Sequence, residues 1–176
     1  FVWTGFDYLG EPSPYDTDAW PSHSSYFGII DLASLPKDRY WLYKSQWNKK
    51  EETFHVLPHW NWQRGDSVAV FCYTTYPEVE LFVGRKSYGK LRFATAEETE
   101  RLAKGETIEG VSRMPEVGTF DIPEWGSAPR PELLPRYRLM WFKVPYKKKM
   151  IKLVAYDAEG KEVARQFIRK AGAPHH

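Results

Sequence analysis

The stretch PEVELFV at residues 77–83 alternates in hydropathy, with Val79, Leu81 and Val83 on one side against two glutamates and a phenylalanine. Successive side chains of a strand point to opposite faces of its sheet, so this pattern predicts a strand with one buried face. The run from Gly84 to residue 87 is turn chemistry, and it leads the chain toward a further short extended segment.

Comparable apolar runs recur along the rest of the chain. The loop Asp157–Lys161 has hairpin composition and joins the last two of these runs. Many short strands with turn signals between them are typical of an antiparallel β-sandwich, so we expect a mainly β fold of immunoglobulin type. The further expected strands are residues 67–73, 138–144, 150–156 and 162–168.

Residues 1–54 have a different character, because they contain half of the tryptophans in less than a third of the chain. Their pattern predicts a strand, a long loop and a helix. We expect the helix to follow Ser34, with Tyr40, Tyr43 and Trp47 on one face because they are spaced three and four residues apart. The chain opens on Phe1 inside an apolar run, so we expect a piece of a longer protein.

A long segment over residues 93–135 interrupts the strand rhythm with five prolines. At its start, Thr95 and Glu98 have the spacing of a capping box, which predicts a helix beginning there. Glu97 and Arg101 are four residues apart in the helpful orientation, so we expect them to pair.

Composition excludes several classes of protein. The formal charge is +2, 42% of the residues are hydrophobic and 16% are aromatic, which supports a packed core and argues against disorder. The near-neutral balance argues against nucleic acid as a partner. No apolar run reaches the length of a membrane span, so no membrane partner is expected. Cys72 is the single cysteine, in an apolar run, and we expect a buried thiol there.

Motifs for phosphate loops, serine nucleophiles and zinc proteases are missing from the sequence, so we expect no cofactor. His55 and His59 have the i, i+4 spacing of a zinc pair, but Pro58 interrupts the helix that this spacing requires. A third ligand at a suitable spacing is also missing, so we expect no metal site. The terminal histidines are set aside as a tail.

Carboxylates and aromatics gather near the start of the chain. Asp7 and Glu11 lie close to Trp3, with further acidic and aromatic residues up to position 20. Aromatic faces stack on sugar rings and carboxylates bind sugar hydroxyls, so this composition suits a glycan subsite. By composition alone, a solvated acidic loop over core tryptophans is the favoured interpretation. Gly10 and Pro12 argue against Asp7 and Glu11 as a catalytic pair on a helix.

Several segments resemble glycoside hydrolase family 2, the β-galactosidase family. Three of them resemble the end of the catalytic barrel: FVWTGFDYLGEP (1–12), WPSHSSYFGIID (20–31) and PKDRYWLY (36–43). Three others resemble the β-sandwich that follows the barrel in many bacterial members: HWNW (59–62), EVELF (78–82) and VAYDAEGK (154–161).

The resemblance implies a domain organisation and a site. Residues 1–54 would be the last strand, loop and helix of a (β/α)8 barrel, and residues 55–176 an immunoglobulin-like sandwich with an irregular insertion at 93–135. Trp3 would lie at the tip of the eighth strand as part of the sugar-binding floor, which agrees with the position of barrel sites. Asp7 and Glu11 would lie at the rim of the sugar-binding site or just behind this rim. The implied mechanism is retaining hydrolysis by two glutamates on earlier strands, so no catalytic residue is expected in this chain.

The implied partners are a β-galactoside or related β-glycoside and the upstream barrel of the same protein. The alternative is a sandwich that binds glycan without catalysis or only packs against the barrel. Its stacking platform would include Trp60 and Trp62, with Trp125 and Trp141 as further candidates, although buried packing is the favoured role for tryptophan. The sequence leaves open a homo-oligomer and a periplasmic or extracellular location of the parent enzyme.

Overall fold

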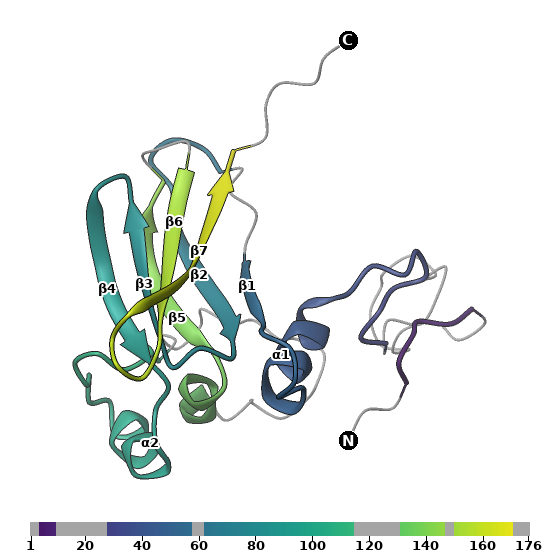
Figure 1. Ribbon diagram of the computed structural model, residues 1–176, viewed down its shortest axis with the longest axis horizontal. Helices are drawn as coiled ribbons and strands as arrows, with labels where there is room; N and C mark the ends of the chain where they lie inside the picture. The colour runs from purple at the N-terminus through teal and green to yellow at the C-terminus, as the bar shows by residue number, and fades with distance from the viewer. Residues whose placement is uncertain (1–3, 10–27, 58–61, 115–130, 147–149, 171–176) are drawn as a thin grey trace, which may run out of the picture.

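The computed structural model describes residues 4–9, 28–57, 62–114, 131–146 and 150–170 of the 176-residue chain (Figure 1). Its strands are β1 (Phe54–Leu57), β2 (Ser67–Thr74), β3 (Glu78–Val83), β4 (Lys86–Arg92), β5 (Leu139–Pro145), β6 (Met150–Tyr156) and β7 (Glu162–Arg169). Its helices are α1 (Asp38–Trp47), α2 (Ala96–Ala103) and the 3-10 helix η2 (Pro131–Arg136). Within these ranges, no helix is long and apolar enough to cross a membrane.

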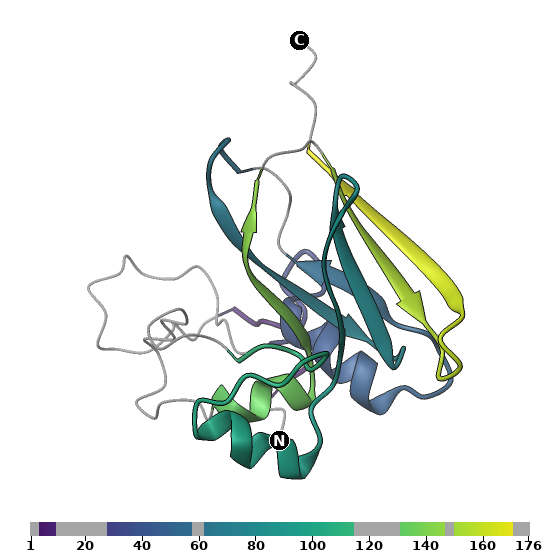
Figure 2. The same cartoon turned by 90° about the vertical axis from the view of Figure 1, so that its left-hand side faces the viewer.

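The strands form two antiparallel sheets that face one another (Figure 2). One sheet has the order β1-β2-β5 and the other has the order β4-β3-β6-β7. Because β2 pairs with β5 and β3 pairs with β6, the chain crosses repeatedly from one sheet to the other. The predicted mainly β, antiparallel sandwich is therefore confirmed.

The core lies between the sheets and follows the alternation in the sequence. Val79 and Leu81 are fully buried and Val83 is nearly so, as the pattern of residues 77–83 predicts. Burying one such side chain contributes about 1.5–3 kcal/mol, so the facing rows supply much of the stability of the sandwich. Other buried members are Val70, Cys72, Leu139, Trp141, Val144, Ile151, Leu153 and Ala155.

Two hairpins of the four-stranded sheet confirm the expected turns. Gly84 has a φ of 62° between β3 and β4, a conformation that glycine adopts without strain. Between β6 and β7, the Asp157 carboxylate accepts the N–H groups of Glu159 and Lys161. That side chain closes the loop at the position that the sequence indicated.

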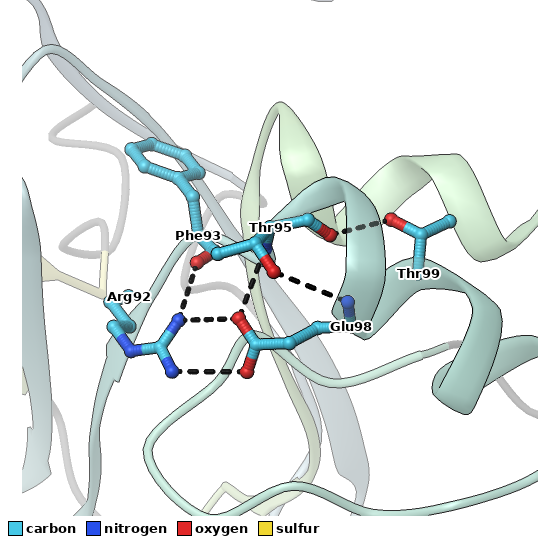
Figure 3. Close-up of polar contacts among 5 residues, drawn as sticks. All are labelled: Arg92, Phe93, Thr95, Glu98 and Thr99. Atoms are coloured by element: carbon cyan, nitrogen blue, oxygen red, sulfur yellow. Dashed lines mark hydrogen bonds and ion pairs between the residues drawn. The ribbon is translucent and has the colours of Figure 1, made fainter.

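Helix α2 begins with the predicted capping box (Figure 3). The Thr95 hydroxyl accepts the Glu98 N–H, and the Glu98 carboxylate accepts the Thr95 N–H. The same carboxylate pairs with Arg92 on β4, which fixes the helix to the sheet. The expected pair of Glu97 with Arg101 is wrong, because Arg101 instead forms an ion pair with Glu106 beyond the helix end.

Helix α1 begins at Asp38, later than the sequence pattern predicted. The Asp31 carboxylate accepts the N–H groups of Ala33 and Leu35, and Ser34 has a φ of 63°. This turn holds residues 31–35 in a non-helical conformation, because a side-chain acceptor competes with the helical backbone bonds. Tyr43 and Trp47 do share a face, as expected, and their rings stack at 4.6 Å with an angle of 11°.

Helix α1 packs against the three-stranded sheet next to β1 (Figure 1). The Trp41 indole stacks on the His55 imidazole with ring centroids 4.3 Å apart and an angle of 11°. After the helix, the backbone of Thr53 joins the sandwich before β1 begins: its N–H donates to the Thr75 hydroxyl, and its carbonyl accepts the Thr75 N–H. The helix and the sandwich are therefore joined by side-chain and backbone contacts.

Candidate functional site

The expected site residue Asp7 lies in a short segment, residues 4–9. Its N–H donates to the Ile30 carbonyl at 2.9 Å, and the Gly5 carbonyl accepts the N–H groups of Ile29 and Ile30. Phe6 and Ile30 form a parallel bridge. Two segments more than twenty residues apart in the sequence therefore lie side by side at this point.

The Asp7 carboxylate is bound on both oxygens. The Gly28 N–H donates to Oδ1 at 2.8 Å, and the Lys37 Nζ lies 2.6 Å from Oδ2. The side chain of Asp7 is 2% exposed and that of Lys37 is 29% exposed. A buried carboxylate is costly unless it is paired and hydrogen-bonded, and here both conditions are met.

Gly28 has no room for a side chain. A Cβ added there would lie 2.3 Å from the Asp7 nitrogen and 2.3 Å from the Phe6 carbonyl carbon. The two backbones are thus in direct contact, which brings the Gly28 N–H within reach of the Asp7 carboxylate. We call Asp7, Gly28 and Lys37 the Asp7 cluster.

A shallow hollow of about 420 Å³ lies beside the Asp7 cluster and is lined by Gly28, Lys37, Asp38 and Arg39. A second hollow, of about 410 Å³, lies at the end of α1 and is lined by residues 49–52 with Thr75 and Tyr76. In the second hollow, the Tyr76 hydroxyl donates to Glu52 at 2.6 Å. Burial, followed by this hydrogen bond, raises the pKa of Tyr76 to about 12.

The other expected site residues are distributed as follows. Trp3, Glu11 and Trp60 lie outside the described residues. Trp62 is 43% exposed, so one of the two tryptophans proposed for a glycan platform has an accessible ring. Trp141 is buried and its indole N–H donates to the Gly89 carbonyl at 3.0 Å, which makes it a core residue instead of a platform residue.

On the outer face of the four-stranded sheet, several charged and aromatic side chains contact one another. The Lys90 ammonium lies 3.3 Å from a Glu78 carboxylate oxygen and 3.9 Å from the centroid of the Tyr156 ring. Tyr156 in turn donates to Glu80 at 2.9 Å. The Lys152 ammonium lies 4.2 Å from the centroid of the Phe82 ring. Aromatic rings covered by ammonium groups offer less surface to a sugar, so this face is a weak candidate for stacking.

In the described part of the chain, no three His, Cys, Asp or Glu side chains are grouped closely enough to hold a metal ion. His55, considered above as a zinc ligand, stacks on Trp41. His59 lies outside the described residues.

Comparison with known proteins adds a family to this geometry. Residues 65–105 match a family model described as a domain of unknown function (DUF4982). The chain is 55% identical to β-galactosidase BoGH2A of Bacteroides ovatus over 93 residues. This match covers 52% of the chain and 10% of that protein. The crystal structure of a β-glycosidase from Bacteroides vulgatus is similar to the chain, with 31% sequence identity and a TM-score of 0.63. The match covers 98% of the chain and 16% of the β-glycosidase. The chain resembles the C-terminal part of a glycoside hydrolase family 2 enzyme.

Other similar proteins extend the likeness. A putative β-glucuronidase of Formosa agariphila is 41% identical over 93 residues, or 51% of the chain and 9% of that protein. The crystal structure of a family 2 member from Bacteroides cellulosilyticus matches with a TM-score of 0.65 and 22% sequence identity. This match covers 97% of the chain and 21% of that protein, and it supports the fold alone. The chain spans about a tenth of the length of the curated relatives it matches. The expected resemblance to family 2 is confirmed.

Sequence reasoning named Asp7 as a candidate site residue but did not name Lys37 and Gly28, which contact its carboxylate. Thirty positions separate Asp7 from Lys37, and no local pattern joins them. The available signal was the lone glycine in the apolar run Tyr26–Ile30, since an isolated glycine in a strand pattern indicates close backbone approach.

Proposed function

We propose that the chain is part of a retaining glycoside hydrolase that acts on β-galactosides or related β-glycosides. The observation that carries this proposal is the 55% identity to the β-galactosidase of Bacteroides ovatus. The identity to the putative β-glucuronidase is lower, at 41% over a match of the same length, which favours galactoside over glucuronide. In this proposal, the immunoglobulin-like sandwich follows the end of a catalytic barrel, with the boundary near residue 54.

The exposed apolar side chains near the start of the described chain support a further part of the protein packing there. Phe6, Leu9, Leu32 and Leu35 are each more than half exposed. Such side chains are expected to be covered when they cluster, because large exposed apolar patches are uncommon on soluble proteins. In the proposed enzyme, the preceding strands and helices of the barrel cover them and supply both catalytic glutamates.

The contribution of this chain to the site is one wall. Trp3 would stack on the sugar, and Asp7 and Glu11 would lie at the rim or just behind it. In a retaining enzyme, one carboxyl protonates the glycosidic oxygen and the other, about 5–5.5 Å away, attacks the anomeric carbon. Since neither group is expected here, the chain supplies binding and shape without proton transfer.

A second candidate function is a non-catalytic glycan-binding sandwich, which the exposed ring of Trp62 favours. Trp60 would complete the platform. The two functions differ in a simple measurement. A platform would slow the chain during electrophoresis through gels that contain a soluble galactan, and Trp62→Ala would remove this retardation. Trp47→Ala, which removes another exposed indole, is the matched control.

The experiment that tests the main proposal assays p-nitrophenyl β-galactoside and p-nitrophenyl β-glucuronide with two proteins. One is the longer natural protein that contains this sequence, and the other is the 176-residue chain. We expect the longer protein to cleave the galactoside faster and the chain alone to cleave neither. Turnover by the chain alone, lost in Asp7→Asn, would place the chemistry in this chain. Inactivity of the longer protein on both substrates would overturn the proposal.

A further inference from the structure

The two sheets end in four edge strands, and three of these are short or partly covered. β1 has only four residues. On β4, both backbone groups of Arg92 bond to the segment that follows α2, at Gly110 and Ser112. On β5, the Met140 carbonyl accepts the Arg113 N–H. Shortening and covering are ordinary ways in which proteins prevent a sheet edge from pairing with another chain.

The fourth edge strand, β7, is long and lacks such a cover. It has eight residues, whereas a common strand has about five or six. In the described part of the chain β7 pairs only with β6, and no further backbone hydrogen bond reaches it. Figure 2 shows β7 at one border of the fold. Its side chains Val163 and Phe167 are 44% and 48% exposed, so this edge is a template for a further strand.

The side chains of β7 alternate between the two faces of the four-stranded sheet. Ala164 and Ile168 pack against the core, and Gln166 between them shares their face. Arg165 and Phe167 lie on the outer face. A strand that continues the sheet with its own core on the same side has to place inward residues opposite inward residues, because a shift by one position exchanges the two faces.

The charges of the outer face select one antiparallel register for a second copy of β7. Pairing centred on Gln166 places Arg165 of each copy opposite Phe167 of the other. Pairing centred on Arg165 would set two guanidinium groups opposite one another, and pairing centred on Phe167 would set Arg165 opposite Arg169. Like charges directly opposite destabilise a sheet, whereas a guanidinium group over an aromatic ring is attracted to it.

The ends and the centre of this register are complementary as well. A register shift in the β6–β7 ladder gives Glu162 the outer-face position before Ala164, where its carboxylate also pairs with Arg165. In the register centred on Gln166, this position lies opposite Arg169 of the second copy, so a carboxylate meets a guanidinium group at both ends. At the centre, Oε1 of Gln166 is buried and accepts no hydrogen bond within the described residues, and the opposite Gln166 amide offers a donor.

We propose that β7 pairs with β7 of a second copy of this chain about a two-fold axis at Gln166. The pairing joins the two four-stranded sheets into one continuous sheet. The contact is self-complementary, so each interaction occurs twice. This inference goes beyond the proposed function, because the association does not depend on whether the longer protein cleaves a glycoside.

The first test measures the mass of the longer natural protein that contains this sequence by sedimentation equilibrium. We expect a dimer. Arg169→Glu should raise its dissociation constant by about 10-fold, because the variant sets two pairs of like charges opposite one another. The double variant Glu162→Arg/Arg169→Glu restores opposite charges and should recover most of the affinity. A monomeric wild type, or a dimer that Arg169→Glu leaves as tight as wild type, would overturn the proposal.

The second test locates the axis by disulfide formation in the longer protein. Opposite residues of an antiparallel pair have Cα atoms about 4.5–5.5 Å apart, within the range of a disulfide, so Gln166→Cys should link to itself on mild oxidation. Ala164→Cys is the matched control, because its two copies would lie about 13 Å apart along the strands. Peptide mapping that joins residue 166 to residue 166 supports the register. A link at residue 164, or none in either variant, would overturn it, and the charge variants test the same pairing with Gln166 intact.

Discussion

Arg92 and Glu98 form a two-point ion pair that joins β4 to α2. The Nη1–Oε1 distance is 2.7 Å and the Nη2–Oε2 distance is 3.0 Å (Figure 3). The hydrogen bonds from Arg92, followed by those from Thr95, lower the pKa of Glu98 to about 2, from an ordinary value near 4.5. The stabilisation is therefore present above about pH 4.5 and is lost as the pH falls toward 2.

Glu98→Gln is expected to lower the free energy of unfolding by about 1 kcal/mol at pH 7. The Arg92 side chain is 43% exposed, so solvent screening keeps the effect small. Denaturant melts from pH 7 to pH 2.5 should show the difference between wild type and variant shrinking as the pH falls. Glu97→Gln, which removes an exposed carboxylate from the same turn, should show little change at any pH. A gap that is constant with pH would contradict the assignment.

Gly28→Ala is expected to destabilise the contact between residues 4–9 and 28–30. The added Cβ would overlap two backbone atoms, and overpacking of this kind costs about 1–3 kcal/mol. Hydrogen exchange of the Asp7 and Ile30 amides reports the loss directly. Gly5→Ala is the matched control, because a Cβ at Gly5 meets no atom within 4 Å. Equal exchange in the two variants would refute the close packing at Gly28.

Trp3→Ala in the longer enzyme is expected to reduce kcat/KM by an amount that corresponds to about 1–3 kcal/mol, by analogy with aromatic stacking on other planar ligands. The reason is the loss of a stacking surface, with no proton-transfer group removed. Both the melting temperature and kcat/KM of the variant are measured. A lower melting temperature with unchanged kinetics would identify Trp3 as packing within the barrel.

Cys72 is expected to resist thiol reagents in the folded protein. It is completely buried between the sheets, and burial raises the pKa of its thiol, so almost no thiolate forms at neutral pH. Reaction with dithionitrobenzoate should be slow in buffer and complete in 6 M guanidinium. Rapid reaction in buffer, with the near-ultraviolet circular dichroism unchanged, would contradict the burial.

The sandwich strands could be predicted because their information is local. Alternating residues such as Val79 and Leu81 determine the buried face, and loops such as Asp157–Lys161 determine the turns. The start of α1 was predicted too early because the Asp31 carboxylate binds the backbone of residues 33–35. A side-chain acceptor that overrides helix periodicity is difficult to recognise without coordinates.

The candidate site was predictable in part. Asp7 drew attention through its aromatic neighbours in the sequence, whereas its partners Gly28 and Lys37 lie 21 and 30 positions away. His55 illustrates the same limit, since nothing in its local sequence predicts that the fold stacks it on Trp41. Contacts between distant segments depend on how the elements pack, and one sequence carries little information on that packing.

The two hydrogen bonds that the Thr53 backbone forms with Thr75 determine where the protein can be cut. A recombinant sandwich begun at Phe54 would lose both bonds and would leave the Thr75 N–H without the carbonyl that accepts it. Starting at Asn48 instead retains the bonds, together with the turn in which the Asn48 side chain accepts the N–H groups of Lys50 and Glu51. For crystallisation or labelling of the sandwich alone, the useful first residue is therefore several positions before its first strand.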